Sequence, residues 1–134
     1  MKLTPYLMFS GNCEKALNFY ADVFGGTITD LKRFEEGPPG SMGDVAPDKI
    51  MHARLSFDGN MIMASDGESQ PVSADGIQLS VDFGDTGKMD NAFKKLSDGG
   101  AIIMDLQDTF WGARFGMLKD QFGFRWMFNC EIKK

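Results

Sequence analysis

The apolar positions of residues 3–34 predict a strand, a helix and a second strand. Residues 3–9 form a short run rich in large apolar side chains, which favours a strand, and residues 27–34 are also β-prone. Between these runs, apolar residues recur at spacings of three and four, as on one face of a helix: Cys13, Ala16, Leu17, Tyr20, Val23 and Phe24. Residues 10–12 offer an N-cap, and Gly25-Gly26 predict a left-handed helix end.

Glycine, proline and other turn residues divide the chain that follows. Residues 35–47 are rich in glycine and proline and predict a long loop, of the kind that often serves as a functional lid or is mobile. Two apolar runs, residues 49–57 and 61–65, flank an Asp-Gly-Asn turn at residues 58–60, which is a strong signal for a β-hairpin. Residues 66–76 are polar and turn-rich, so we expect them to link two halves of the chain.

The second half of the chain repeats this plan. Residues 77–83 alternate apolar and polar side chains, which predicts a half-buried strand. Asp85 or Thr86 can cap a helix whose apolar stripe recurs at helical spacing: Met89, Ala92, Phe93 and Leu96. Gly99-Gly100 ends this helix, as Gly25-Gly26 does in the first half.

Three further strands complete the second half, at residues 101–106, 114–119 and 124–130, the last two flanking a turn at 120–123. Each half therefore reads strand, helix and three strands, which predicts two pseudo-symmetric βαβββ modules, about residues 1–66 and 76–134. Neither module alone would bury both faces of its sheet. We therefore expect an α+β fold in which the modules pair as one domain around a cup, with the helices outside and a ligand site inside.

Composition and charge narrow the possible partners. The chain has 134 residues, of which 43% are hydrophobic and 25% charged, values that are ordinary for one globular domain. Its net charge is −5 and no cluster of lysine or arginine is present, so nucleic acid and anionic membranes are poor electrostatic partners. No run approaches the roughly 18 apolar residues that cross a bilayer, and a cytoplasmic protein is expected.

The two cysteines, Cys13 and Cys130, lie at opposite ends of the chain without CxxC spacing. This arrangement argues against a disulfide framework and against a structural zinc site. Cys13 belongs to the apolar stripe of the first helix, and Cys130 lies near the end of the last strand. Buried, inert thiols are therefore favoured over catalytic nucleophiles.

Three segments carry a resemblance to a known family. They are PYLMFSGNCEKALNFYADVFGG (residues 5–26), DKIMHARLSFDGNMIMASD (48–66) and TFWGARFGMLKDQFGFRWMFNC (109–130). With the repeat, they resemble the vicinal oxygen chelate (glyoxalase/bleomycin-resistance) superfamily and its PhnB-like branch, sometimes labelled demethylubiquinone methyltransferase-like. The resemblance implies the two-module fold and a homodimer. The superfamily includes isomerases, dioxygenases, resistance enzymes and non-catalytic antibiotic-binding proteins, so the fold alone does not select an activity.

The resemblance also implies where a metal would bind, on the first and last strands of each module. Those places fall at about Pro5, Met63 or Ala64, Gly76 or Ile77, and Met127. A slip of one residue adds only Gln78 as a plausible donor, whereas a transition-metal site needs three or four. The chain has a single histidine, which excludes a site with two histidines unless a second subunit completes the cup. No metal and no other cofactor is therefore predicted.

The methyltransferase label finds no support in the residues. A nucleotide-type methyl-donor site usually needs a glycine-rich turn between a strand and a following helix. The glycine pairs Gly25-Gly26 and Gly99-Gly100 come instead at the ends of predicted helices, and no G-x-G-x-x-G run is present.

The candidate site residues are polar side chains that alternation turns toward the cup. His52 and Arg54 share one strand face, opposite the apolar residues Met51, Ala53, Leu55 and Phe57. Gln78 and Ser80 face the cup from the second module, Arg114 could join them, and Trp111 could wall the pocket mouth together with Phe110.

The predicted roles follow from the side-chain chemistry. His52 is the candidate general acid or base, and Arg54 the candidate anchor for a carboxylate, phosphonate or phosphate. In the alternative interpretation, His52 and Arg54 only satisfy Asp48, Asp66 or backbone groups and hold strands together.

Three functions stay open from the sequence. The first is a protein that binds a small, anionic or aromatic molecule in the cup, with or without metal-independent catalysis. The second is a metal-dependent lyase, isomerase or dioxygenase, which the missing donors disfavour. The third is a non-catalytic protein that sequesters a drug or metabolite.

Overall fold

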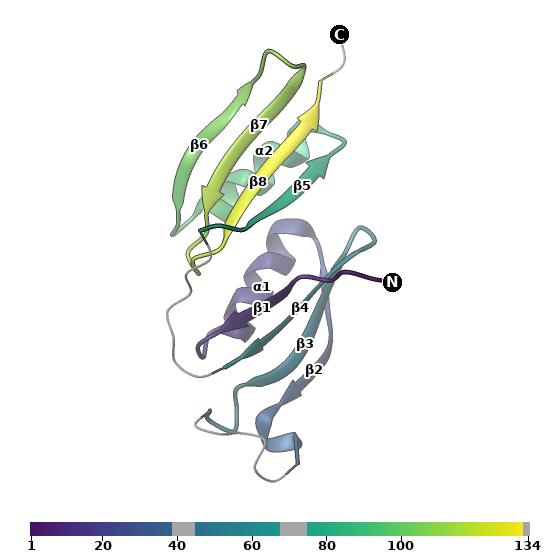
Figure 1. Ribbon diagram of the computed structural model, residues 1–134, viewed down its shortest axis with the longest axis vertical. Coiled ribbons are helices and arrows are strands. Elements are labelled where there is room, and N and C mark those ends of the chain that lie inside the picture. The colour runs from purple at the N-terminus through teal and green to yellow at the C-terminus, as the bar shows by residue number, and fades with distance from the viewer. Residues whose placement is uncertain (39–44, 68–74, 133–134) are drawn as a thin grey trace. The chain divides into compact units, whose positions relative to one another are not determined.

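The computed structural model describes residues 1–38, 45–67 and 75–132. The chain divides into two compact units, residues 1–72 and 73–134. Each unit contains a four-stranded sheet and an α-helix, labelled α1 and α2 in Figure 1. Within the described ranges, no helix is both long enough and apolar enough to cross a membrane.

The N-terminal unit has the predicted order of one strand, one helix and three strands. Its elements are β1 (Tyr6–Phe9), α1 (Cys13–Phe24), β2 (Thr27–Arg33), β3 (Ile50–Phe57) and β4 (Asn60–Asp66). A 3-10 turn, η1 (Phe34–Glu36), follows β2. The strand order across the sheet is β1-β4-β3-β2, in which β1 runs parallel to β4 and the other neighbours are antiparallel. Of the predicted loop, residues 39–44 lie outside the described residues.

The C-terminal unit has the same topology. Its elements are β5 (Gln78–Phe83), α2 (Thr86–Ser97), β6 (Ala101–Asp108), β7 (Ala113–Lys119) and β8 (Arg125–Glu131). The strand order is β5-β8-β7-β6, with β5 parallel to β8 and the remaining pairs antiparallel. The predicted α+β fold with two βαβββ modules is therefore confirmed. Of the predicted link, residues 68–74 lie outside the described residues.

An equivalent glycine pair follows each helix, but only Gly25 is a left-handed C-cap as predicted, because α2 ends at Ser97 with the extended residue Asp98 as its C-cap and Gly99 comes after it. Gly25 and Gly99 have φ of 70° and 75°, in the left-handed region where a side chain is strained. Their neighbours lack room for a side chain: a Cβ on Gly26 would lie 2.9 Å from a backbone carbonyl oxygen of β3, and one on Gly100 would clash with the carbonyl oxygen of Lys119. The first glycine of each pair supplies conformation, and the second lets backbone approach backbone.

The hairpin between β3 and β4 has the predicted tight turn. Phe57 pairs with Asn60, and the two residues between them, Asp58 and Gly59, have φ of 48° and 79°. Two consecutive residues with positive φ are the signature of a type I′ turn, which matches the twist of the flanking strands.

The N-terminus of α1 differs from the prediction. Asn12 stands at the N-cap position, but its side chain makes no capping hydrogen bond. The buried carboxylate of Asp66, at the end of β4, accepts hydrogen bonds from the backbone amides of Gly11 (2.8 Å), Cys13 (3.0 Å) and Ile50 (2.9 Å). One side chain thereby ties the helix start to two strands, a long-range contact that local sequence does not reveal. In α2, by contrast, Asp85 caps as predicted, accepting from the amide of Gly87.

A second buried carboxylate fixes the turn between β7 and β8. Asp120 accepts hydrogen bonds from the amides of Phe122 (2.8 Å) and Phe124 (3.0 Å) and from Nε1 of Trp126 (2.9 Å). Both Asp66 and Asp120 are almost fully buried. Buried carboxylates are stable in a fold when several N–H donors satisfy them, as happens here.

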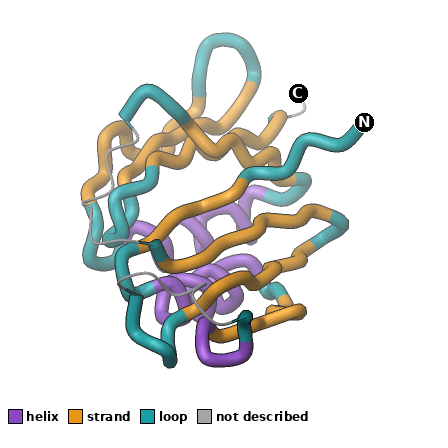
Figure 2. The backbone as a smooth tube through the Cα atoms, turned by 60° about the horizontal axis from the view of Figure 1, so that its bottom comes forward, coloured by secondary structure: helices purple, strands orange, loops and turns teal. Residues whose placement is uncertain are grey.

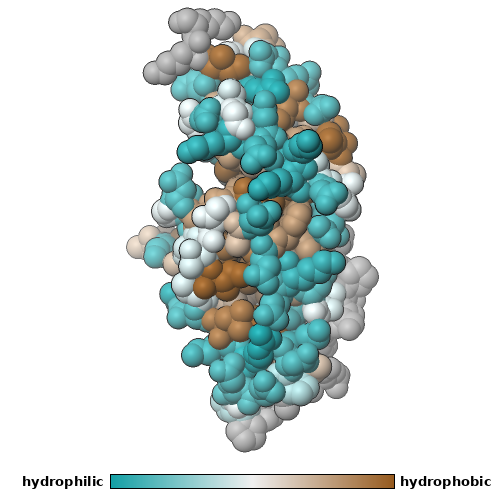
Figure 3. Space-filling model, turned by 180° about the vertical axis from the view of Figure 1, so that it is seen from behind, coloured by the Kyte–Doolittle hydropathy of each residue, from teal (hydrophilic) through white to brown (hydrophobic). Residues whose placement is uncertain are grey.

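Each helix packs against one face of its own sheet (Figure 2). The apolar stripes predicted from helical spacing are buried in both units, including Cys13, Tyr20 and Phe93. No helix formed by the described residues of the same unit packs on the other face of either sheet. Large apolar side chains stay exposed in both units, and hydrophobic patches interrupt the hydrophilic surface in Figure 3. The exposed large apolar side chains include Tyr6, Met8, Ile77, Ile102, Ile103, Met104, Phe110 and Trp111.

Candidate functional site

The helix-free face of the N-terminal sheet carries the predicted pair His52 and Arg54. Alternation along β3 sends Ala53 and Leu55 into the core under α1, so His52 and Arg54 point to the opposite side. A bulge beside His52 shifts the register, and Ile50 rather than Met51 is buried at the strand start. The neighbouring strands add large or polar side chains to this face: Tyr6, Met8, Met63 and Ser65.

His52 contacts a residue that sequence reasoning did not assign to it. The hydroxyl of Tyr6 lies 3.3 Å from Nδ1 of His52, and the two ring centroids are 5.9 Å apart. One strand separates the residues, because β4 lies between β1 and β3. Only the parallel pairing of β1 with β4, in which Tyr6 lies opposite Met63, brings them together, and no local spacing signals it.

Arg54 is only partly satisfied by its neighbours. Its Nη1 lies 3.3 Å from Oδ2 of Asp30, and both side chains are about half exposed. Asp30 has a positive φ of 51° at an irregularity of β2, which turns it toward β3. The Nε atom of Arg54 is buried and has no hydrogen-bond partner among the described residues. A buried N–H donor without an acceptor is costly, so a ligand acceptor would be favoured here.

Gln78 and Ser80 lie on the helix-free face of the C-terminal sheet, as predicted. They pair with Arg125 and Met127 of β8, while the intervening Leu79 faces α2 with Trp126. Within the part of the chain that the structure describes, the buried Oε1 atom of Gln78 lacks a hydrogen-bond partner, like Nε of Arg54. These two residues belong to a different unit from His52 and Arg54, and the common cup of the two pairs stays a prediction.

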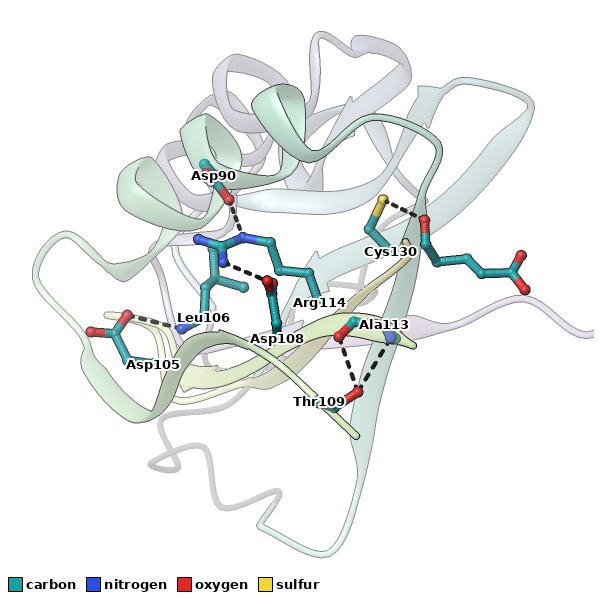
Figure 4. A network of polar contacts seen from close by, with 9 residues as sticks. Asp90, Asp105, Leu106, Asp108, Thr109, Ala113, Arg114 and Cys130 are labelled. Atoms are coloured by element: carbon teal, nitrogen blue, oxygen red, sulfur yellow. Dashed lines mark hydrogen bonds and ion pairs between the residues drawn. The ribbon is translucent and has the colours of Figure 1, made fainter. Parts of the chain in front are cut away.

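The expected placement of Arg114 needs correction. Its Nε donates to Oδ1 of Asp90 on α2 at 2.8 Å, and its Nη1 lies 3.4 Å from Asp108 (Figure 4). Arg114 shares its strand face with Gly116 and Leu118, which pack beneath α2. It therefore lies on the opposite side of the sheet from Gln78 and Ser80, and its carboxylate neighbours raise the pKa of its guanidinium further.

Trp111 lines a pocket within the C-terminal unit. The pocket has a volume of about 390 Å³ and is formed by the ends of β5 and β8 and the start of β7. Its lining residues are Asp82, Phe83, Trp111, Gly112, Ala113, Asn129 and Glu131. The predicted place of Trp111 at the mouth of a cup shared by the two modules stays a prediction. Asp82 was missed, although it continues the alternation of Gln78 and Ser80 along β5.

The residues at the family's metal positions do not fit a divalent metal. Within the described parts of the chain, no group of three or more histidine, cysteine, aspartate or glutamate side chains is close enough to hold an ion. On the paired strands β1 and β4, Tyr6 and Leu7 lie opposite Met63 and Ala64, which are poor donors for zinc, iron or manganese.

Neither cysteine is available as a nucleophile. Cys13 is fully buried, and this burial, together with the nearby Asp66 and Glu14 carboxylates, raises the pKa of its thiol well above the ordinary value of 9.0. Cys130 is also buried, at the end of β8. Both thiols are part of the core, as expected.

Comparison with known proteins identifies the family. Residues 1–128 match the model of the 3-demethylubiquinone-9 3-methyltransferase family. Protein YjdN of Escherichia coli K12 is 34% identical over 139 residues, which cover 96% of this chain and 95% of that protein.

Two solved structures share both sequence and fold with the chain. Protein PA1353 of Pseudomonas aeruginosa has a TM-score of 0.86 at 36% identity and covers 99% of both chains. The PhnB protein of Bacillus cereus, described as a 3-demethylubiquinone-9 3-methyltransferase, has a TM-score of 0.77 at 29% identity, over 97% of this chain and 99% of that one. The chain therefore belongs to the 3-demethylubiquinone-9 3-methyltransferase family, the PhnB-like family that its sequence resembles.

Proposed function

We propose that the protein binds a small anionic or aromatic molecule on the helix-free face of its N-terminal sheet, without a resident metal. The observation that carries this proposal is the buried Nε of Arg54, which has no hydrogen-bond partner in the ranges that the structure describes. A carboxylate or phosphonate oxygen would satisfy this donor and would form the charge-assisted, often bidentate contact that guanidinium groups favour.

The existing partner of Arg54 does not prevent this contact. Its ion pair with Asp30 joins two half-exposed side chains at 3.3 Å, and such pairs contribute little to stability. A ligand oxygen can share the guanidinium with Asp30 or replace it. The neighbouring Met8 and Met63 offer flexible, polarisable side chains to an apolar or aromatic part of the ligand.

His52 supplies the only imidazole on this face. The hydroxyl of Tyr6 is beside Nδ1, which leaves Nε2 to face a ligand as a proton donor or acceptor. The methyl transfer named in the family is not part of the proposal. Gly25 and Gly99 follow helices instead of opening them after a strand, so neither pair forms a methyl-donor loop.

Calorimetric titration with benzoate and phenylphosphonate tests the proposed anion site. We expect the native protein to bind at least one of them and Arg54→Met to weaken that binding by about tenfold or more, the effect of removing a charged hydrogen bond. The matched control is Arg114→Met, which removes an equal charge on the helix side of the other unit and should leave the affinity unchanged. Equal affinities in native protein and Arg54→Met would overturn the proposal.

A second experiment separates catalysis from sequestration. Molecules that stay bound through purification can be identified by native mass spectrometry and then followed for conversion by the protein. We expect His52→Ala to bind them but to lose any turnover. Turnover retained in His52→Ala would remove the acid–base role, and binding without turnover in the native protein would identify a sequestering protein.

A further inference from the structure

We infer that the pocket beside Trp111 is a second ligand site, which takes an aromatic ring carrying a positive charge. All of its lining residues belong to the C-terminal unit, whereas Arg54 belongs to the N-terminal unit. Its chemistry is also opposite, because its polar lining is acidic. The inference therefore goes beyond the proposed function and stands or falls independently of it.

Strand pairing builds the acidic wall of this pocket. Asp82 and Asn129 are opposite each other on the parallel strands β5 and β8, and Nδ2 of Asn129 donates to Oδ1 of Asp82 at 3.2 Å. This bond orients the Asp82 carboxylate and leaves its second oxygen for a ligand. Glu131 is the next residue of β8 on the same face, and it lies opposite Ala113 of β7, whose short side chain leaves space beside it.

A hydrogen-bonded turn holds the aromatic wall. The amide of Thr109 donates to the carbonyl of Ala113 at 2.7 Å, and the amide of Ile132 donates to the carbonyl of Gly112 at 2.9 Å. The turn thus connects β6 to β7 and is tied to the end of β8. Trp111 projects from this turn and is 57% exposed. Its ring packs edge-to-face against the ring of Phe110, with the two ring centroids 5.0 Å apart. An indole held in this way is available to a ligand.

The charges of the lining select the ligand class. Among the lining residues, Asp82 and Glu131 are acidic and none is lysine, arginine or histidine. Two carboxylates repel an anion and attract an ammonium group, and an indole face adds a cation–π interaction. Two carboxylates are too few to hold a bare metal ion. A volume of about 390 Å³ lies at the small end of ligand pockets, so one ring with a short charged arm fits best.

The two tryptophans give this inference a site-specific test. In ¹H–¹⁵N spectra, the indole N–H of Trp111 reports on the pocket, whereas that of Trp126 is buried against Asp120 and reports on the fold. Three probes share one ring and differ in charge: benzylamine, benzyl alcohol and benzoate. We expect benzylamine to shift the Trp111 resonance at a concentration at least tenfold lower than benzoate does, with the Trp126 resonance unmoved.

Isosteric variants test whether the two carboxylates cause the preference for benzylamine over benzoate. Asp82→Asn combined with Glu131→Gln should reduce the difference between benzylamine and benzoate to threefold or less. The exposed Asp98, elsewhere in the same unit, gives the control Asp98→Asn, which alters net charge without touching the lining and should keep the native preference. The inference is overturned if benzoate matches benzylamine in the native protein, if no probe shifts Trp111, or if the double variant keeps the full preference. None of these outcomes depends on Arg54.

Discussion

At the scale of single residues, two buried carboxylates do most to fix local structure. Asp66 accepts N–H hydrogen bonds from residues 16, 53 and 55 positions away along the chain, and Asp120 accepts them from residues two, four and six positions further on. A carboxylate offers acceptors on both oxygens, whereas an amide would turn a donor toward one of these N–H groups. The negative charge, and not only the shape, is therefore required.

Asp66→Asn should accordingly destabilise the protein. We expect a loss of about 2 kcal/mol or more in the free energy of unfolding, because charged hydrogen bonds are weakened and the amide of Ile50 loses its acceptor. Urea unfolding followed by circular dichroism measures the change. The exposed Asp98→Asn should stay within about 0.5 kcal/mol of the native protein, and an equal effect of both substitutions would contradict the role of Asp66.

The buried thiol of Cys13 predicts a loss of stability in alkaline solution. Because the native state raises the pKa of this thiol, the unfolded chain releases its proton first as pH rises above 9.0. Stability present below that pH is then lost with a slope of about 1.4 kcal/mol per pH unit. Between pH 9 and 10.5, the free energy of unfolding should fall less steeply with pH in Cys13→Ala than in the native protein. The comparison is of slopes, so the constant stability difference between the two proteins is subtracted first. Parallel slopes for the two proteins would argue against the raised pKa.

At the scale of elements, the double glycines give the sharpest prediction. Gly100→Ala should cost about 2 kcal/mol or more, because its Cβ would overlap the carbonyl of Lys119 and neither backbone can move freely. Gly99→Ala should cost about 1 kcal/mol, the penalty of a side chain at positive φ. Gly76→Ala, where a Cβ meets nothing within 4 Å, is the control. Thermal unfolding ranks the stabilities of the three variants. If Gly100→Ala were as stable as Gly76→Ala, the close approach of Gly100 to the carbonyl of Lys119 would be refuted.

The sequence predicted most elements because their signals are local. Helical stripes, paired glycines and the residues 58–60 turn each lie within one segment, and the structure has them where they were expected. The face of Arg114 was misjudged because β7 carries large side chains on both faces, Phe115 and Met117 on one and Leu118 on the other. Apolar alternation cannot identify the core side of such a strand.

The candidate site was less predictable than the fold, because it depends on contacts across strands. His52 and Arg54 were found from their shared face, but Tyr6 meets His52 only through the parallel pairing of β1 with β4. Likewise, Glu131 joins Asp82 only because β5 and β8 are neighbours in the sheet. Long-range pairing is not encoded in the spacing of any one segment, so these partners needed the structure.

At the scale of the whole molecule, one plan is used twice with different chemistry. Both units have the same strand order, yet the helix-free face of the first carries His52 and Arg54, whereas that of the second carries the acidic pocket at Trp111. Residues under the helices preserve the scaffold, and residues on the opposite faces are free to differ. A family built on this plan can therefore vary its ligands without changing its fold.

The most direct test of the proposed function is a crystal structure of the protein grown with phenylphosphonate. We predict phosphonate density within hydrogen-bond distance of Nε of Arg54, with the phenyl ring against Met8 or Met63. Density bound only elsewhere, or a soaked crystal in which Arg54 keeps Asp30 as its sole partner, would contradict the assignment of this face as the ligand site.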